Sequence, residues 1–138
     1  MKKLLLLILL PLLAATTGCK KMIEKKIEAE LMNAITSGAW YVEHYRENAT
    51  DITASFNDYE FRFQRDGTVQ GLRNGHEPDK GTWQGNLENA SISALFPTAT
   101  DPLKKVNGHW KITDSYMDYV EAEMSIQGGK NILHLRKK

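Results

Sequence analysis

From residue 39 to the C-terminus, short apolar runs alternate with turn residues, and this pattern constrains the fold more than any other feature. In the clearest run, YEFRF at 59–63, every second residue is aromatic. A period of two places these rings on one face of a β-strand. Asp66-Gly67 then favours a tight hairpin, because glycine adopts positive φ without steric cost. Eight predicted strands begin near residues 40, 59, 69, 81, 92, 110, 120 and 133.

Eight short strands joined mostly by tight turns form an antiparallel meander, and a sheet of this size tends to curl and close into a barrel. Periodicity alone leaves a two-sheet sandwich open. The length of 138 residues, with 41% hydrophobic residues, suits one globular domain. We therefore predict an all-β domain over 37–138, an eight-stranded up-and-down barrel preceded by a short N-terminal helix.

Residues 1–18 form a separate segment. Lys2 and Lys3 precede a run of ten largely apolar residues, 4–13, which small residues follow. Ten residues are too few to span a bilayer, which needs about 20. The pattern is typical of an export signal, which is removed in the mature protein.

Cys19 is the only cysteine, so an intramolecular disulfide is excluded. It directly follows AATTG (14–18), which resembles the lipobox of bacterial lipoproteins. That resemblance implies that 1–18 is a lipoprotein signal peptide and that Cys19 carries diacylglyceryl and N-acyl (palmitate) groups. Lysine at position 20 implies, by the sorting rules of Gram-negative bacteria, a lipid-anchored protein of the outer membrane, on its periplasmic face or at the cell surface. Ordinary signal cleavage that leaves a free thiol is the alternative.

The tether, 19–36, is predicted to contain an amphipathic helix over 20–36, because helix formers fill it and no proline interrupts it. This helix either packs its apolar stripe on the domain or lies on anionic lipid through its lysines. The stripe consists of Ile23, Ile27, Leu31 and Ile35.

Several segments together resemble a known family. SGAW at 37–40 resembles the lipocalin opening signature, Gly-x-Trp at the start of the first strand. The run 31–138 is similar to small lipocalin-like lipoproteins of Gram-negative bacteria. This resemblance implies an up-and-down barrel and no defined reaction. The other matching segments are FNDYEFRFQRDGTV (56–69), GTW (81–83), W-x-I (110–112) and NILHLRKK (131–138).

No motif for catalysis or for cofactor binding occurs in the sequence. It contains no Gly-x-Ser-x-Gly and no phosphate-binding glycine loop. Zinc needs convergent ligands, whereas the four histidines stand on four different predicted elements, so we predict no metal site. The 18 basic and 17 acidic residues nearly balance, which does not favour nucleic-acid binding. We expect a non-enzymatic protein without a cofactor. The remaining carboxylates near the seventh strand are expected to face solvent, namely Asp114, Asp118, Glu121 and Glu123.

The alternation also predicts the barrel interior. An eight-stranded barrel is either filled by side chains or holds one small ligand. Three tryptophans and three other rings favour filling, whereas Gly81 and Gly85 beside Trp83 favour space for a ligand. The predicted inward side chains are Trp40, Val42, Tyr59, Phe61, Phe63, Val69, Trp83, Ile92, Ala94, Trp110, Ile112, Val120, Ala122, Met124, Leu133 and Leu135.

Two functions remain open. In the first, the barrel binds a small apolar molecule. In the second, a solid-core envelope module binds or inhibits a protein partner through its loops and through outer tyrosines at 41, 45, 116 and 119. A void too small for any ligand would favour the second. The predicted ligand-binding residues are Trp40, Val42, Tyr59, Phe61, Phe63, Trp83, Trp110 and Met124.

Overall fold

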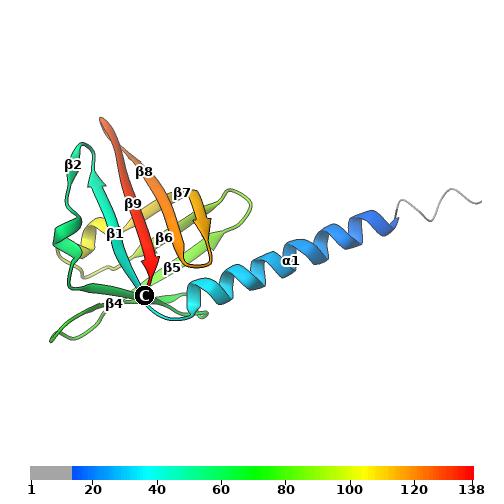
Figure 1. Ribbon diagram of the computed structural model, residues 1–138, viewed down its shortest axis with the longest axis horizontal. Helices are drawn as coiled ribbons and strands as arrows, with labels where there is room; N and C mark the ends of the chain where they lie inside the picture. Colours follow the sequence, from blue (N-terminus) through cyan, green and yellow to red (C-terminus); the bar gives the residue numbers. More distant parts are fainter. Residues whose placement is uncertain (1–13) are drawn as a thin grey trace, which may run out of the picture. The chain divides into compact units, whose positions relative to one another are not determined.

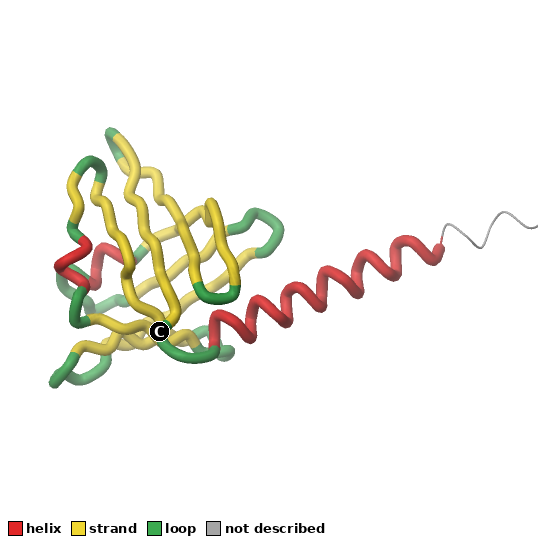
Figure 2. The backbone as a smooth tube through the Cα atoms, in the orientation of Figure 1, coloured by secondary structure: helices red, strands yellow, loops and turns green. Residues whose placement is uncertain are grey.

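The computed structural model describes residues 14–138, so residues 1–13 of the predicted signal peptide lie outside the described residues. The described chain divides into two units, which meet between Met32 and Asn33 and are treated separately. One helix precedes nine strands and two 3₁₀-helices (Figures 1 and 2). These elements are α1 (Ala14–Thr36), β1 (Trp40–Glu47), β2 (Thr50–Asp51), η1 (Thr53–Phe56), β3 (Tyr59–Phe63), β4 (Thr68–Arg73), β5 (Asp79–Asn86), β6 (Ser91–Leu95), η2 (Leu103–Val106), β7 (Gly108–Tyr116), β8 (Tyr119–Ile126) and β9 (Gly129–Lys137).

The helix α1 is longer than the predicted helix, which began at residue 20. Ile23 and Ile27 are exposed, whereas Ile35, in the unit that contains the strands, is half-buried. Within the described part of the chain, no helix is both long and apolar enough to cross a membrane.

The strands form a closed barrel. Their order is β1-β3-β4-β5-β6-β7-β8-β9, every neighbouring pair is antiparallel, and β9 returns to pair with β1. The β1–β9 ladder runs from Trp40 opposite Lys137 to Glu47 opposite Asn131. The two-residue strand β2 pairs only with the end of β1. Closure confirms the predicted eight-stranded up-and-down barrel and excludes the sandwich.

Most of the predicted inward side chains fill the barrel. Trp40, Val42, Tyr59, Phe61, Phe63, Val69, Trp83, Trp110, Ala122 and Leu133 are buried. The others, Ile92, Ala94, Ile112, Val120, Met124 and Leu135, are half-buried.

The placement of Tyr45 on the outer face was wrong. Its side chain is fully buried in the core. The register between β1 and β9 shifts between Val42 and His44, so one extra residue stands in β1. A bulge of this kind reverses the alternation that follows it, which turns Tyr45 inward and His44 outward.

Candidate functional site

One end of the barrel is closed by a plug, which we define as η1 together with segment 96–107 (Figure 2, short red helices). Phe56, Phe96 and Leu103 are each 1% exposed. The Phe56 ring stacks on Tyr45 with 5.2 Å between ring centroids. Periodicity could not predict this plug, because its side chains come from connections between strands.

Two glycines make space for the plug. A Cβ atom added at Gly81 would lie 2.5 Å from the Leu95 carbonyl oxygen and 2.8 Å from the Phe96 ring. At Gly71 it would lie 3.1 Å from the Leu103 side chain. The space that we predicted beside Gly81 is therefore occupied by the protein's own side chains and leaves no room for a ligand.

Hydrogen bonds join the plug to β1 and hold segment 96–107 together. The Tyr45 hydroxyl donates to the Lys105 carbonyl oxygen at 2.6 Å. The Asn107 side chain accepts from the Phe96 amide at 2.7 Å and donates to the Phe96 carbonyl at 3.1 Å. Burial, and then the charge of Glu47, raises the pKa of Tyr45 to about 12. In the described residues, no buried polar side-chain atom lacks a hydrogen-bond partner, so the interior presents no unsatisfied group to a polar ligand.

The opposite end, which we call the mouth, contains a narrow apolar crevice of about 50 Å³. An engineered cavity that binds benzene measures about 150 Å³, and typical ligand pockets measure about 300–1,000 Å³. The crevice therefore admits only a small apolar group unless side chains move. It is lined by Ile35, Trp40, Phe63, Ile92, Trp110, Ile112, Val120, Ala122, Leu133 and Leu135.

The predicted ligand-binding residues divide between the two ends. Trp40, Phe63 and Trp110 line the crevice. Tyr59 and Phe61 instead face the plug, with ring centroids 6.2 Å from Phe56 and 6.3 Å from Phe96, respectively.

The other three predicted ligand-binding residues, Val42, Trp83 and Met124, do not line the crevice. The Trp83 indole donates to the Gln64 carbonyl at 2.9 Å. Six other lining residues were predicted to face inward but not to bind the ligand, namely Ile92, Ile112, Val120, Ala122, Leu133 and Leu135. Ile35 was missed in both predictions, and its place at the end of the helical apolar stripe was the available signal.

Comparisons with known proteins agree with this architecture. No family model and no curated protein matches the sequence. A solved lipocalin-like protein from Bacteroides uniformis superimposes with a TM-score of 0.51 at 19% identity, over 75% of this chain and 98% of that one. The fold is lipocalin-like. A DUF4847 family protein from Bacteroides vulgatus gives a TM-score of 0.54 at 13% identity, over 75% of this chain and 94% of that one. At these identities the likeness shows the fold alone.

The end of α1 covers part of the mouth of this lipocalin-like barrel. The Trp40 indole donates to the Ile35 carbonyl at 3.0 Å. The Lys137 ammonium donates to the Ala34 carbonyl at 2.6 Å and to the Ser37 hydroxyl at 3.0 Å. The same ammonium lies 5.2 Å from the centre of the Trp40 ring. These bonds hold Ile35 over the crevice.

Three exposed apolar side chains stand on hairpin tips at the mouth end, namely Leu87, Tyr116 and Met117. A larger hollow of about 550 Å³ lies outside the lipocalin-like barrel, beside Gly38 and residues 62–65. It is an open surface depression whose walls mix polar and charged side chains with Ala39 and Phe63, so it does not enclose an apolar molecule.

Three carboxylates near β7 and β8 contact hydroxyl or basic side chains. Asp114 accepts from the Tyr119 hydroxyl at 3.1 Å, and Glu123 pairs with Lys130 at 3.0 Å. Asp118 is exposed and lies 3.8 Å from Arg136. Over residues 14–138, no group of three or more His, Cys, Asp or Glu side chains is arranged to hold a metal ion.

Proposed function

We propose that this chain is a non-enzymatic, lipid-anchored envelope protein whose lipocalin-like barrel binds a small apolar ligand at its mouth. The observation that carries the proposal is the crevice, which is lined entirely by apolar side chains at the end that the plug leaves open. Each buried methylene of a ligand contributes about 0.8 kcal/mol. Apolar burial is therefore the driving force available here.

The size of the crevice restricts what enters it. About 50 Å³ is less than the volume of two water molecules in the liquid, at about 30 Å³ each. Only the end of an alkyl chain or a comparably small group fits. The rest of the molecule lies along the rim formed by Leu87, Tyr116 and Met117, which are 42–69% exposed. We expect modest affinity for this reason.

A fatty acid with a terminal bromine tests the crevice, since bromine quenches tryptophan fluorescence on contact. We expect ω-bromodecanoate to quench Trp40 and Trp110, which line the crevice. Ala122→Val adds two carbon atoms to the lining and should abolish quenching. Ala54→Val, on the exposed surface of η1, is the matched control. Undiminished quenching in Ala122→Val, with an unchanged melting temperature, would contradict binding at the mouth.

The lipid anchor rests on Cys19 and on the segment before it. More than one acyl chain is needed for stable anchoring, and a lipidated N-terminal cysteine carries several. Cys19→Ser should move the protein from the membrane fraction to the soluble fraction, with the parent chain as control. Retention of Cys19→Ser in membranes after an alkaline wash would exclude this anchor.

A second function, binding of an envelope protein through the outer surface, is favoured by the filled interior. Its candidate contacts no longer include Tyr45, which is buried, but they keep Tyr116, which is 69% exposed. Crosslinking in cells through a photoreactive residue at position 116 should capture one specific protein if this function holds. Capture that persists in Ala122→Val would separate this function from ligand binding.

A further inference from the structure

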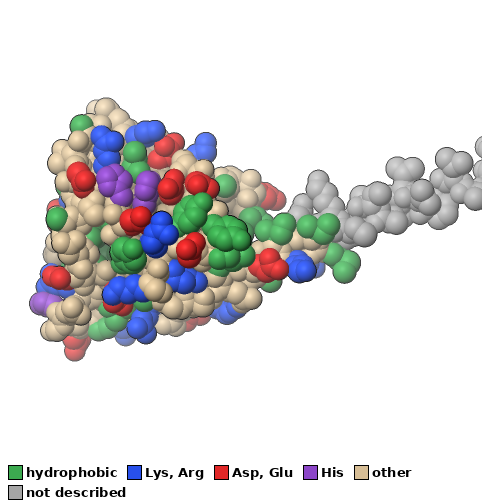
Figure 3. Space-filling model, in the orientation of Figure 1, with side chains coloured by type: hydrophobic (Ala, Val, Ile, Leu, Met, Phe, Trp, Pro, Cys, Tyr) green, Lys and Arg blue, Asp and Glu red, His purple; other side chains and the backbone are tan. Residues whose placement is uncertain are grey.

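Closure of the barrel brings together two histidines from its first and last strands. His44 in β1 stands directly opposite His134 in β9. Their ring centroids are 5.4 Å apart, with 58° between the ring planes. Both side chains face outward and remain about one-third exposed, at 33% and 30%. Figure 3 shows two adjoining histidine side chains in purple on the face that it draws.

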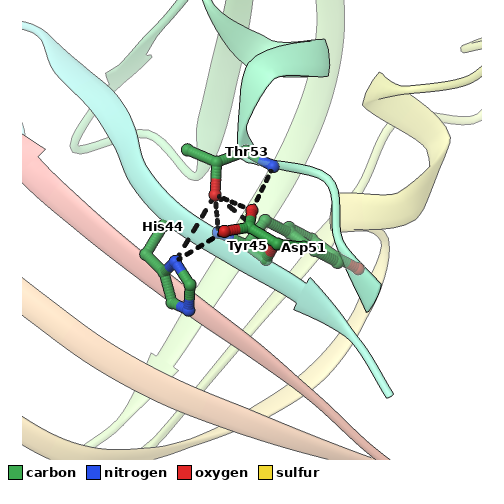
Figure 4. Close-up of polar contacts among 4 residues, drawn as sticks. All are labelled: His44, Tyr45, Asp51 and Thr53. Atoms are coloured by element: carbon green, nitrogen blue, oxygen red, sulfur yellow. Dashed lines mark hydrogen bonds and ion pairs between the residues drawn. The ribbon is translucent and has the colours of Figure 1, made fainter. Parts of the chain in front are cut away.

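A carboxylate flanks each ring on the side away from the other histidine. His44 Nδ1 lies 3.9 Å from Asp51 Oδ2 and 3.4 Å from the Thr53 hydroxyl (Figure 4). On the other side, Glu121 in β8 stands opposite His134, with its Oε1 3.9 Å from His134 Nδ1. The order across the sheet is therefore carboxylate, imidazole, imidazole, carboxylate.

The Asp51 carboxylate is held in place. Its Oδ1 accepts from the Thr53 hydroxyl at 2.6 Å and from the Thr53 amide at 2.9 Å. These two hydrogen bonds are the main reason that the pKa of Asp51 lies below its usual value. The two bonds fix the position of this carboxylate beside His44.

We propose that His44 and His134 together bind one divalent transition-metal ion, with Asp51 and Glu121 as the carboxylates that orient the two rings. Histidines that bind metals commonly direct their second nitrogen to a carboxylate, which fixes the ring and raises its basicity. Here Nδ1 of each ring faces the carboxylate, which leaves Nε2 as the nitrogen available to the metal. Imidazole suits Zn²⁺, Cu²⁺ and Ni²⁺, whereas Mg²⁺ and Ca²⁺ prefer oxygen ligands.

Two protein ligands are fewer than the four of a structural zinc site or the three of a catalytic one. Water completes the coordination, so the metal is bound at the surface and exchanges readily. The flanking carboxylates add negative charge that attracts the cation. Arg46 and the pair Arg136–Glu43 lie on the same strands, and Arg46 offsets part of the charge of Asp51.

Titration of the full chain with Zn²⁺ tests the site, in a Cys19→Ser background that removes the only thiol. We expect one Zn²⁺ per chain near neutral pH. His44→Asn and His134→Asn should each abolish measurable binding, and the double variant should show no further loss. The matched controls are His76→Asn and His109→Asn, since both side chains are exposed and lie away from the pair. Unchanged binding in either His44→Asn or His134→Asn, or an equal loss in the controls, overturns the proposal.

Two further measurements do not depend on the histidine variants. Paramagnetic Cu²⁺ should broaden amide signals of β1, β8 and β9 around the pair before signals elsewhere; broadening centred on His76 or His109 contradicts the site. Asp51→Asn or Glu121→Gln should weaken Zn²⁺ binding by about 10–100-fold, the usual effect of removing an orienting partner. Full affinity in both variants overturns the role of the carboxylates.

Discussion

The two ends of the barrel share the same eight strands but differ in how the chain connects them. At the plug, η1 and η2 bring Phe56, Leu103 and Val106 into the core, with exposures of 1–6%. At the mouth, short hairpins join the strands, and side chains such as Ile112 and Leu135 stay half-buried around the crevice. The difference arises in the connections, because the sheet is continuous around the barrel.

Because of this difference, the plug contributes most to the stability of the barrel, whereas the mouth keeps apolar surface accessible. Apolar burial at the plug removes large side chains from water almost completely, which is the main stabilising contribution in a small domain. The mouth leaves apolar surface accessible, which costs stability and makes a binding site available. We therefore expect substitutions at the plug to change the free energy of unfolding and substitutions at the mouth to change binding.

The largest expected difference comes from one substitution made at both ends. Leu103→Ala at the plug should lower the free energy of unfolding by about 3–5 kcal/mol, because Leu103 is 1% exposed and its removal leaves a cavity. Leu135→Ala at the half-buried mouth should cost only about 1–2 kcal/mol. Denaturant unfolding of the two variants measures both losses in the free energy of unfolding. Equal losses would show that the plug and the mouth do not differ in their contribution to stability.

Two glycines of β5 give the next largest contrast. Gly81→Ala places a Cβ atom against the Leu95 carbonyl and the Phe96 ring, and we expect a loss of about 2–3 kcal/mol from overpacking. Gly85→Ala places it 3.6 Å from Trp83, an ordinary contact, and should have little effect. Thermal unfolding of both variants measures the difference. A tolerated Gly81→Ala would show that Phe96 can move and that the plug is loosely packed.

The bond between Tyr45 and η2 should contribute less than these packing effects. Tyr45→Phe removes the donor to the Lys105 carbonyl, and we expect a loss of about 1–2 kcal/mol. The folded protein retains the Tyr45 proton up to about pH 12, whereas the unfolded chain loses it near pH 10.0. The parent's free energy of unfolding should therefore fall as the pH rises from 10 to 12. The free energy of unfolding of Tyr45→Phe should lack this fall between pH 10 and pH 12.

Denaturant unfolding at pH 9 and pH 11 measures how far the free energy of unfolding falls with pH. The matched control is Tyr116→Phe, since Tyr116 is 69% exposed and carries no plug contact. If Tyr45→Phe and Tyr116→Phe lose stability equally with pH, Tyr45 is not the group responsible.

Sequence periodicity predicted the strands because side chains in a sheet alternate with a period of two. It identified Phe61 and Trp110 as inward-facing, and the closed barrel confirms both. It failed at Tyr45, because a bulge adds one residue to β1 and no local pattern reveals an extra residue.

The plug and the histidine pair could not be predicted from the sequence, for a different reason. Leu103 lies in a connection without strand periodicity, so its burial depends on how the chain folds across the barrel end. His44 and His134 meet only because the last strand pairs with the first. Of the residues that line the crevice, Trp40, Phe63 and Trp110 were predicted to bind a ligand. The volume of the crevice could not be predicted, because it depends on packing at the plug and the mouth together.

The smallest expected effect concerns the segment that covers the mouth. Lys137→Met keeps the apolar stem but removes the ammonium that donates to Ala34 and Ser37. We expect a global loss below about 1 kcal/mol, because the bonds are partly solvated. Local opening should be much more evident, since Ile35 would be less firmly held and the Trp40 indole bond to it would break more often.

Hydrogen exchange of the Trp40 indole measures this opening separately from global unfolding. We expect faster exchange in Lys137→Met, with the exchange of the Trp110 indole unchanged, because that group donates to the buried Val106 carbonyl. Lys138→Met, which removes an exposed ion pair with Glu60, is the matched control. If both indoles exchange faster together, the mouth opens only when the whole barrel unfolds. The two ends would then not be independent.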